Sequence, residues 1–251
     1  MIALEGATKR YGNSTVLDDV TVSFGDAGVT ALIGPNGAGK STLFGLIGRL
    51  IHADTGTVTV DGQDVTKADS RELARTIAVL RQDNHIAARL TVEDLVEFGR
   101  FPHSGGRLTV EDRDHIERAI ADMDLQPFRH RFLDELSGGQ RQRAFVAMAL
   151  AQDTKYVLLD EPLNNLDPKH GVALMKLLDD LAEQRGLKIV VVMHDINIAS
   201  QFADTIIAMR DGRVIHHGRT EDVVTVPNLV QIYETPVQVE EINGRRVVLW
   251  D

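Results

Sequence analysis

The sequence predicts an α/β fold, in which a parallel sheet is covered by helices on both sides and carries additional antiparallel strands. Strand-like runs that are apolar throughout alternate with segments of helical spacing, which is typical of strands buried on both faces. Asp211-Gly212 and Asn243-Gly244 each separate two β-type runs and are hairpin signals. From about Thr91 to Ala151 the spacing is helical only, which predicts a helical insertion near the middle of the chain.

The individual elements follow from the same patterns, read from the amino terminus. The expected strands are Ile2–Glu5, Val20–Phe24, Val29–Ile33, Thr57–Asp61, Ile77–Leu80, Tyr156–Leu159, Ile189–Met193, Thr205–Arg210, Arg213–His216, Val237–Ile242 and Arg245–Leu249. The expected helices are Lys40–Leu50, Thr91–Phe98, Thr109–Met123, Ser137–Ala151 and Val172–Arg185. The last of these helices carries its leucines on one face, as expected for a helix that covers a sheet.

Composition narrows the classes of protein before any motif is considered. The 251 residues include 27 Lys and Arg against 37 Asp and Glu, a formal net charge of −10, whereas proteins that bind DNA or anionic lipid are normally basic. The chain has no cysteine, which excludes disulfide scaffolds, cysteine nucleophiles, zinc fingers and iron–sulfur clusters. Its first residues show no signal-peptide pattern, and no apolar run approaches the ~20 residues of a membrane span. We therefore expect a cytosolic, soluble protein.

A glycine-rich turn carries the first motif. The phosphate-loop pattern G-x-x-x-x-G-K-[ST] is matched by Gly34-Pro35-Asn36-Gly37-Ala38-Gly39-Lys40-Ser41. Glycines let backbone N–H groups and the following helix N-terminus approach phosphate oxygens closely. Lys40 is expected to reach the β- and γ-phosphates, and the Ser41 hydroxyl to ligate Mg²⁺. Because an apolar strand leads into the loop and a helix leads out, the sequence predicts a nucleotide site.

A second motif narrows the choice among nucleotide-binding proteins. The buried strand Tyr156–Leu159 is followed by two carboxylates, Asp160 and Glu161. Asp160 is placed to bind Mg²⁺, directly or through its second coordination sphere, and Glu161 can orient a water that attacks the γ-phosphate. The guanine-reading motif Asn-Lys-x-Asp is absent from the sequence, so ATP is favoured over GTP.

The deciding segment is a second glycine-rich stretch, Leu136-Ser137-Gly138-Gly139-Gln140, followed by a helix. Physically it is another anion cradle at a helix N-terminus, with Ser137 as a hydroxyl donor. One nucleotide has no use for two such cradles from the same side of one chain, but two facing copies could each close the other's site. In this pentapeptide and in the spacing of every motif from Met1 to Gly218, the sequence resembles the ATP-binding cassette (ABC) ATPases, whose family signature the pentapeptide is.

The resemblance implies roles for single residues. Tyr11 matches the aromatic residue that stacks on adenine, and Gln82 matches the glutamine that touches Mg²⁺ and the water at the hinge to a helical subdomain. His194 matches the histidine that contacts the γ-phosphate. Asp167 matches the acid of a loop that crosses the dimer interface, where Asn164-Asn165 replaces the more usual small residues.

Motifs and resemblance together define the candidate site. The expected catalytic residues are Glu161, His194 and Gln82. The expected Mg²⁺ ligands are Ser41, Gln82 and Asp160. The residues expected to bind ATP are Tyr11, Gly34, Pro35, Asn36, Gly37, Ala38, Gly39, Lys40, Ser41, Thr42, Ser137, Gly138, Gly139, Gln140, Asp160 and Asp167.

The resemblance also implies an architecture and a set of partners. It implies one ABC ATPase domain over residues 1–251, with a P-loop NTPase core of residues 1–82 and 156–251 and a helical signature subdomain of residues 83–155. A C-terminal helix and hairpin extension would cover residues 219–251. Two cassettes would form a homodimer that sandwiches two ATP molecules. A separate membrane permease would dock on the helical insertion at the cytoplasmic face of the membrane, with an extracytoplasmic substrate-binding protein as an indirect partner.

The expected cargo rests on resemblance alone. Gly99–His103 is similar to a stretch of importers of the iron–siderophore, haem and cobalamin type. Glu161–His170, His194–Asn197 and the Val237–Leu249 hairpin are similar to the ferric-siderophore branch, so a subunit of such an importer is expected. Import of haem or cobalamin is the neighbouring alternative, and an exporter subunit also stays open. A soluble ABC protein that acts on DNA or ribosomes is a further alternative. The negative charge, the single cassette and the lack of a heptad run favour transport without a nucleic-acid partner.

Overall fold

The computed structural model describes residues 1–25, 28–82, 84, 86, 88–164 and 166–250. By their internal contacts these residues form two compact units, residues 1–68 with 190–251 and residues 69–189. They are called unit 1 and unit 2 below, and each is described by itself. In the described part of the chain, no helix is both long and apolar enough to cross a membrane.

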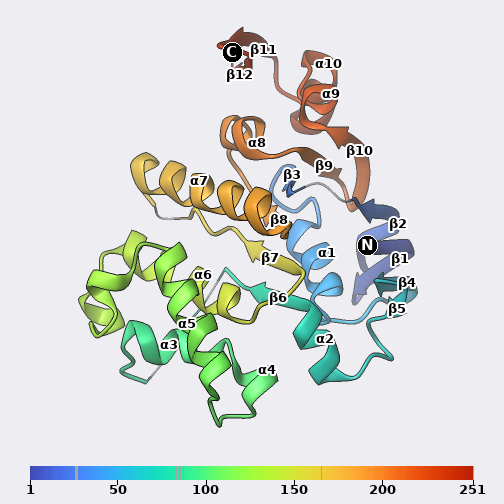
Figure 1. Cartoon of the computed structure of the whole chain (residues 1–251). Helices are drawn as coiled ribbons and strands as arrows, with labels where there is room; N and C mark the ends of the chain where they lie inside the picture. Colours follow the sequence, from blue (N-terminus) through green and yellow to red (C-terminus); the bar gives the residue numbers. More distant parts are fainter. Residues whose placement is uncertain (26–27, 83, 85, 87, 165, 251) are drawn as a thin grey trace. The chain divides into compact units, whose positions relative to one another are not determined.

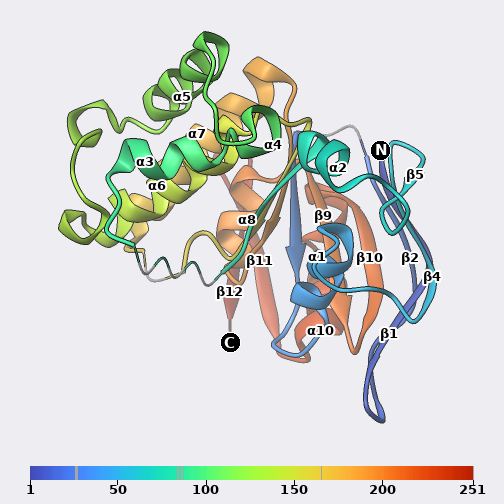
Figure 2. The same ribbon diagram turned by 90° about the horizontal axis from the view of Figure 1, so that it is seen from below.

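Unit 1 contains an antiparallel sheet with the strand order β2-β1-β4-β5 (Figure 2). Its strands are β1 (Ile2–Tyr11), β2 (Ser14–Phe24), β4 (Thr55–Val60) and β5 (Gln63–Asp64). Buried Ile2 and Leu4 alternate with more exposed neighbours, the pattern of a strand with one face on a core. β1 and β2 extend farther than predicted, because exposed polar residues at the tip of their hairpin interrupt the apolar pattern.

The second sheet of unit 1 leads into the candidate phosphate loop. β3 (Val29–Ile33) is completely buried. Its neighbours in the sheet are β9 (Thr205–Arg210), which runs parallel to it, and β8 (Lys188–Val192). The first two residues of β8 belong to unit 2. β10 (Arg213–Arg219) pairs with β9 in antiparallel fashion. Asp211-Gly212 connects these two strands with φ values of 49° and 76°, so the predicted hairpin is confirmed.

Unit 1 ends in a second confirmed hairpin, β11 (Val237–Ile242) and β12 (Arg245–Trp250). The helices of the unit are α1 (Lys40–Ile47), α8 (Ile196–Phe202), α9 (Thr220–Val223) and α10 (Val226–Tyr233) (Figure 1). Asn197 of α8 donates to the Val248 carbonyl at 3.1 Å and accepts from the Val248 N–H at 2.7 Å. The hairpin is therefore tied to the helix that follows His194.

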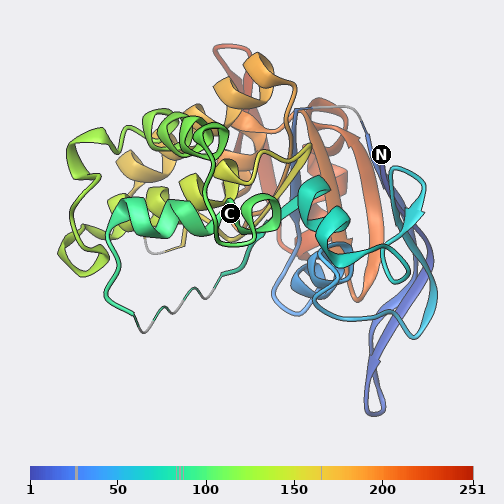
Figure 3. The same cartoon turned by 60° about the horizontal axis from the view of Figure 1, so that its bottom comes forward.

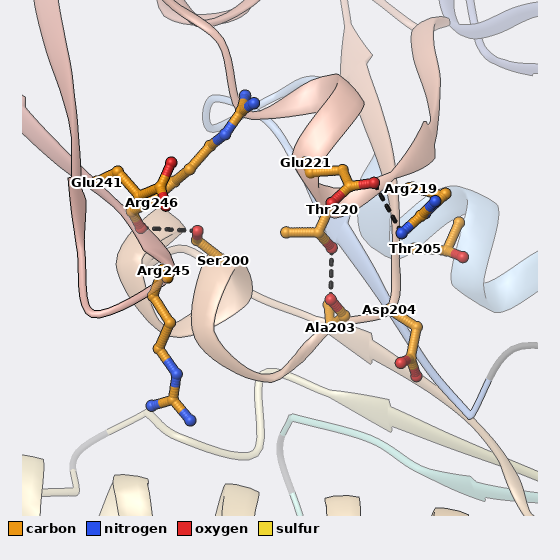
Figure 4. Close-up of a pocket in the computed structure, with 11 residues that line it drawn as sticks. Ser200, Ala203, Asp204, Thr205, Arg219, Thr220, Glu221, Glu241, Arg245 and Arg246 are labelled. Carbon is orange, nitrogen blue, oxygen red and sulfur yellow. Dashed lines mark hydrogen bonds and ion pairs between the residues drawn. The ribbon is translucent and has the colours of Figure 1, made fainter.

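A cavity of about 500 Å³ lies beside this contact, between the hairpin, α8 and α9 (Figure 4). In its wall the Ser200 hydroxyl donates to the Arg246 carbonyl at 2.8 Å, and the Thr220 hydroxyl donates to the Ala203 carbonyl. Arg246 in turn donates from its guanidinium to the Val224 carbonyl at 2.6 Å. These lining groups hold the C-terminal elements together.

Unit 2 combines helices with a parallel strand pair. β6 (Ile77–Leu80) and β7 (Tyr156–Asp160) pair in parallel, with Leu80 opposite Leu159. The α-helices are α2 (Ser70–Thr76), α3 (Val92–Phe98), α4 (Phe101–Ser104), α5 (Val110–Asp122), α6 (Gly138–Ala151) and α7 (Pro168–Arg185), and 3₁₀ turns cover Gln126–Phe128 and Leu133–Glu135. The green helices α3, α5 and α6 pack on one another (Figure 3).

The starts of the helices in unit 2 follow from local polar chemistry. α3, α5 and α6 begin at capping boxes, Thr91 with Asp94, Thr109 with Asp112, and Ser137 with Gln140. The three helices therefore begin within one residue of the predicted starts. α7 begins earlier than predicted, at Pro168, because Asp167 caps it and proline suits the first helical position.

The capping box of α5 also takes part in a buried ion pair. Arg100 Nε donates to Asp112 Oδ1 at 2.8 Å, and both side chains are only 4% exposed. The Thr109 N–H and hydroxyl donate to Asp112 Oδ2 at 2.9 and 2.8 Å. Burial raises the pKa of Asp112, but the hydrogen bonds from Thr109 and Arg100 outweigh burial and bring the pKa to about 2.

This pair predicts a pH-dependent part of the stability. Because the pKa of Asp112 in the folded state lies below its usual 3.8, the ionised carboxylate contributes about 2 kcal/mol above that pH, which is lost as the pH falls toward 2. Asp112→Asn leaves Arg100 buried without its counter-ion and is expected to lower the free energy of unfolding by about 3 kcal/mol at neutral pH. Urea unfolding measures both effects. Asp18→Asn, which breaks the exposed Asp18–Arg213 pair, is the control and should cost under about 1 kcal/mol. Equal losses in the two variants would contradict the prediction.

Candidate nucleotide-binding site

The candidate phosphate loop connects β3 to α1 within unit 1, and its glycines are required by close backbone approach. A Cβ on Gly34 would lie 2.1 Å from the Met209 carbonyl oxygen, and one on Gly39 would lie 2.8 Å from the Val16 carbonyl oxygen. Both glycines also have positive φ, 143° and 99°. The buried Lys40 donates from Nζ to the carbonyls of Gly34 and Pro35 at 2.8 and 3.0 Å. Its ammonium group therefore spans the loop that would surround a phosphate.

The β9–β10 hairpin holds this loop in place. The Gly212 N–H in the β9–β10 hairpin donates to the Ala38 carbonyl at 3.1 Å, and the Gly212 carbonyl accepts from the Asp18 N–H at 2.9 Å. The Tyr233 hydroxyl of α10 is buried and has no hydrogen-bond partner among the described residues. Burial raises the pKa of Tyr233 to about 12, although the Gly34 N–H acts in the opposite direction. The loop is thus fixed by the β9–β10 hairpin.

The other candidate residues of unit 1 are exposed or half-buried. Ser41, at the start of α1, and His194, two residues after the end of β8, are both exposed, and Thr42 is half-buried. Tyr11, at the end of β1, is 51% exposed, with the Lys9 ammonium 5.5 Å from its ring centre. An exposed ring at a strand end can stack on a base, as the resemblance implies for Tyr11.

In unit 2 the structure brings three candidate residues to one sheet edge. Gln82 follows β6, while Asp160 and Glu161 end and follow β7. Since β6 and β7 are parallel neighbours, their carboxyl ends lie at the same edge. Glu161 has a φ of 49°, a backbone conformation that a non-glycine residue rarely adopts. Parallel strands bring ligand-binding residues to this edge in α/β sheets.

The signature segment forms the beginning of α6. The Ser137 hydroxyl accepts from the Gln140 N–H at 3.3 Å, and Gln140 Oε1 accepts from the Ser137 N–H at 3.0 Å. Gly138 is exposed and a Cβ there would meet no atom within 4 Å. Gly139 is buried, and a Cβ there would lie 3.0 Å from the His170 ring. The exposed start of the helix can therefore face an anion while its second glycine packs on α7.

Sequence reasoning assigned no separate role to His170, which connects this segment with the loop before α7. The Asp167 carboxylate accepts from the His170 N–H at 2.9 Å and is 2.8 Å from His170 Nδ1. These hydrogen bonds lower the pKa of Asp167. Only the spacing of Asp167 and His170 by three residues signals this contact in the sequence. Asn165 of the same loop lies outside the described residues.

With this geometry in view, the comparisons with known proteins identify the family. Residues 17–164, which contain the phosphate loop, the signature segment and the paired carboxylates, match the ABC transporter family. The chain belongs to the ABC transporter family. It is an ABC-type ATPase, and the predicted fold class is confirmed by the cassettes that it resembles.

Relatives of this ABC cassette cover nearly all of it. It is 47% identical to the petrobactin import ATP-binding protein YclP of Bacillus subtilis over 98% of both chains. It is 39% identical to the ferric enterobactin transport ATP-binding protein FepC of Escherichia coli, over 91% of this chain and 85% of that one. Among solved structures, a dimeric ATP-binding cassette in a post-hydrolysis state bound to ADP and Pi has a TM-score of 0.76 and 31% identity, covering 88% of this chain and 99% of the other.

Proposed function

We propose that this ABC ATPase energises the import of ferric siderophores through a membrane permease. The observation that carries the proposal is the 47% identity, over 98% of both chains, to a petrobactin import ATP-binding protein. The similarity to a ferric enterobactin transport ATP-binding protein supports the same cargo class. Both relatives are named for iron–siderophore complexes, so siderophore import is favoured over haem or cobalamin import and over export.

The residues of unit 1 and unit 2 take complementary roles in the proposed hydrolysis. Phosphate-loop N–H groups and Lys40 bind the β- and γ-phosphates, Tyr11 stacks on adenine, and His194 donates to the γ-phosphate. Glu161 orients the attacking water and accepts its proton. Catalysis of this kind consists of positioning and electrostatic stabilisation.

The proposed metal ligands fit Mg²⁺ by their chemistry. Ser41, Gln82 and Asp160 supply a hydroxyl, an amide and a carboxylate oxygen, the hard donors that Mg²⁺ prefers. Bound Mg²⁺ would neutralise charge on the β- and γ-phosphate oxygens. Asp160 ends β7 and Gln82 follows β6, its parallel neighbour, which supports their joint assignment.

We further propose that two copies form a homodimer when ATP is bound. Ser137, Gly138, Gly139 and Gln140 of one copy would cover the nucleotide on the phosphate loop of the other, and Asp167 would lie at the interface. The dimeric state of the similar cassette bound to ADP and Pi supports this assembly. The proposed core, helical subdomain and C-terminal extension keep the boundaries predicted from the sequence.

The permease is proposed to bind the helical subdomain at the cytoplasmic membrane face. Phe98 at the end of α3 and Phe101 at the start of α4 are 57% and 62% exposed, and Val110 of α5 is 79% exposed. Exposed large apolar side chains of this kind suit a protein partner. A substrate-binding protein outside the membrane would then deliver the iron complex to the permease.

The test is uptake of labelled iron by cells that lack this chain. Uptake of iron-loaded petrobactin or enterobactin is expected to fall to background and to return with the wild-type chain but not with Glu161→Gln. Uptake of free iron is the control and should not change. Unchanged siderophore uptake with lost haem or cobalamin uptake would overturn the cargo proposal and leave the ATPase in place.

A further inference from the structure

The loop after β7 places the side chain of Asn164 on the carboxylate of Glu161. Asn164 Nδ2 donates to Glu161 Oε2, and the Asn164 N–H donates to the Glu161 carbonyl at 3.2 Å. The same residue therefore holds both the side chain and the backbone of Glu161. Pro162, between them, is buried, which restricts the path of the turn.

The turn is held on both sides. Glu161 adopts a φ of 49°, a strained backbone conformation for a non-glycine residue that persists only where surrounding contacts require it. After the turn, the Leu166 N–H donates to the Leu163 carbonyl at 3.2 Å, and Asp167 caps α7. Glu161 and Asn164 thus face each other in a turn that is anchored to β7 on one side and α7 on the other.

We propose that Asn164 is a positioning residue that orients Glu161 for the hydrolytic step. This rests on the proposed role of Glu161 as the group that orients the attacking water. A glutamate side chain has three rotatable torsions, and a hydrogen bond to one carboxylate oxygen removes much of that freedom. Because the Asn164 amide binds Oε2, we assign the orientation of the water to Oε1. Asn164 itself touches neither water nor nucleotide in this scheme.

The positioning role requires a hydrogen-bond donor in the side chain at position 164. A purely structural role in the turn does not, so the two roles can be distinguished by substitution. Aspartate has nearly the same shape as asparagine and is equally at home in turns, but it cannot donate to a carboxylate and repels it. Serine is shorter and keeps a donor. A turn that only needs a suitable backbone residue would accept aspartate without loss.

The experiment measures ATP hydrolysis by Asn164→Asp and Asn164→Ser in the intact chain. For Asn164→Asp the kcat is expected to fall about tenfold or more, because the bond that is lost involves a charged group, while the KM for ATP and the melting temperature stay unchanged. Asn164→Ser should lie between this variant and the wild type. The control is Asn243→Asp, which adds the same charge in an exposed turn of the C-terminal hairpin and should leave kcat unchanged.

Two outcomes separate this inference from the proposed function. A wild-type kcat in Asn164→Asp, alongside a strongly impaired Glu161→Gln, would overturn the positioning role alone. Wild-type turnover in Glu161→Gln would overturn the catalytic role on which it rests. In the Glu161→Gln background, Asn164→Asp should change the residual rate by less than about twofold, because the two residues act through one group.

Discussion

Glu161→Gln is expected to bind ATP with wild-type affinity and to hydrolyse it at least about a hundredfold more slowly. Glutamine keeps the size of the side chain, but its amide cannot accept a proton from the attacking water. The phosphate loop and Lys40 lie on a separate segment and are unaltered, so the contacts proposed to hold the phosphates remain. The variant should therefore accumulate with ATP bound.

Single-turnover hydrolysis and the affinity for a fluorescent ATP analogue measure the two parts of this prediction. Glu183→Gln is a matched control, because Glu183 is exposed on α7. Its turnover should equal that of the wild type. A Glu161→Gln chain with a normal single-turnover rate would remove Glu161 from the proton-accepting role.

Lys40→Ala is expected to weaken ATP binding by about tenfold to a hundredfold, as the loss of one or two charge-assisted hydrogen bonds implies. Lys40 is 5% exposed and its ammonium group already lies inside the loop, bound to the Gly34 and Pro35 carbonyls. Phosphate oxygens would compete for the same three N–H donors. Hydrolysis should fall as well, because the nucleotide is no longer held at its β- and γ-phosphates.

Equilibrium binding of the ATP analogue tests this second prediction directly. Lys176→Ala, which removes an exposed lysine from α7, is the control and should bind as the wild type does. A melting curve checks that Lys40→Ala keeps its fold, because the Lys40 side chain also donates hydrogen bonds to the Gly34 and Pro35 carbonyls of the loop. Unchanged ATP affinity in a folded Lys40→Ala chain would show that residues 34–41 are not the phosphate loop.

Much of the fold was predictable because local chemistry decides it. The turns Asp211-Gly212 and Asn243-Gly244 need positive φ, which these residues adopt easily, so both hairpins appeared in the sequence. The starts of α3, α5 and α6 were visible in their capping boxes. The short helix α8 was missed, because its seven residues are too few for a clear helical period.

The positions of the candidate residues on helices, strands and loops were predictable from the sequence, and their contacts were not. Motif spacing located Lys40 where the phosphate loop passes into a helix and Glu161 directly after a strand, which is where the structure has them. The hydrogen bond from the Gly212 N–H to the Ala38 carbonyl joins residues far apart in the chain and leaves no local pattern. The hydrogen bond between Asn164 and Glu161 forms in a turn where Glu161 has a positive φ, and a glutamate in the sequence does not indicate that conformation.

The hydrogen bonds between Asn197 of α8 and Val248 of β12 allow one backbone amide to report on the contact between the two elements. Hydrogen exchange at Val248 requires its N–H to leave Asn197 Oδ1, so the exchange rate follows the opening of the contact with α8. Because α8 begins two residues after His194, a movement of His194 that also displaces α8 would weaken the hydrogen bonds between Asn197 and Val248. Deuterium uptake at Val248, 51 residues beyond Asn197 in the chain, would then report on movement near His194 without a label attached at that position.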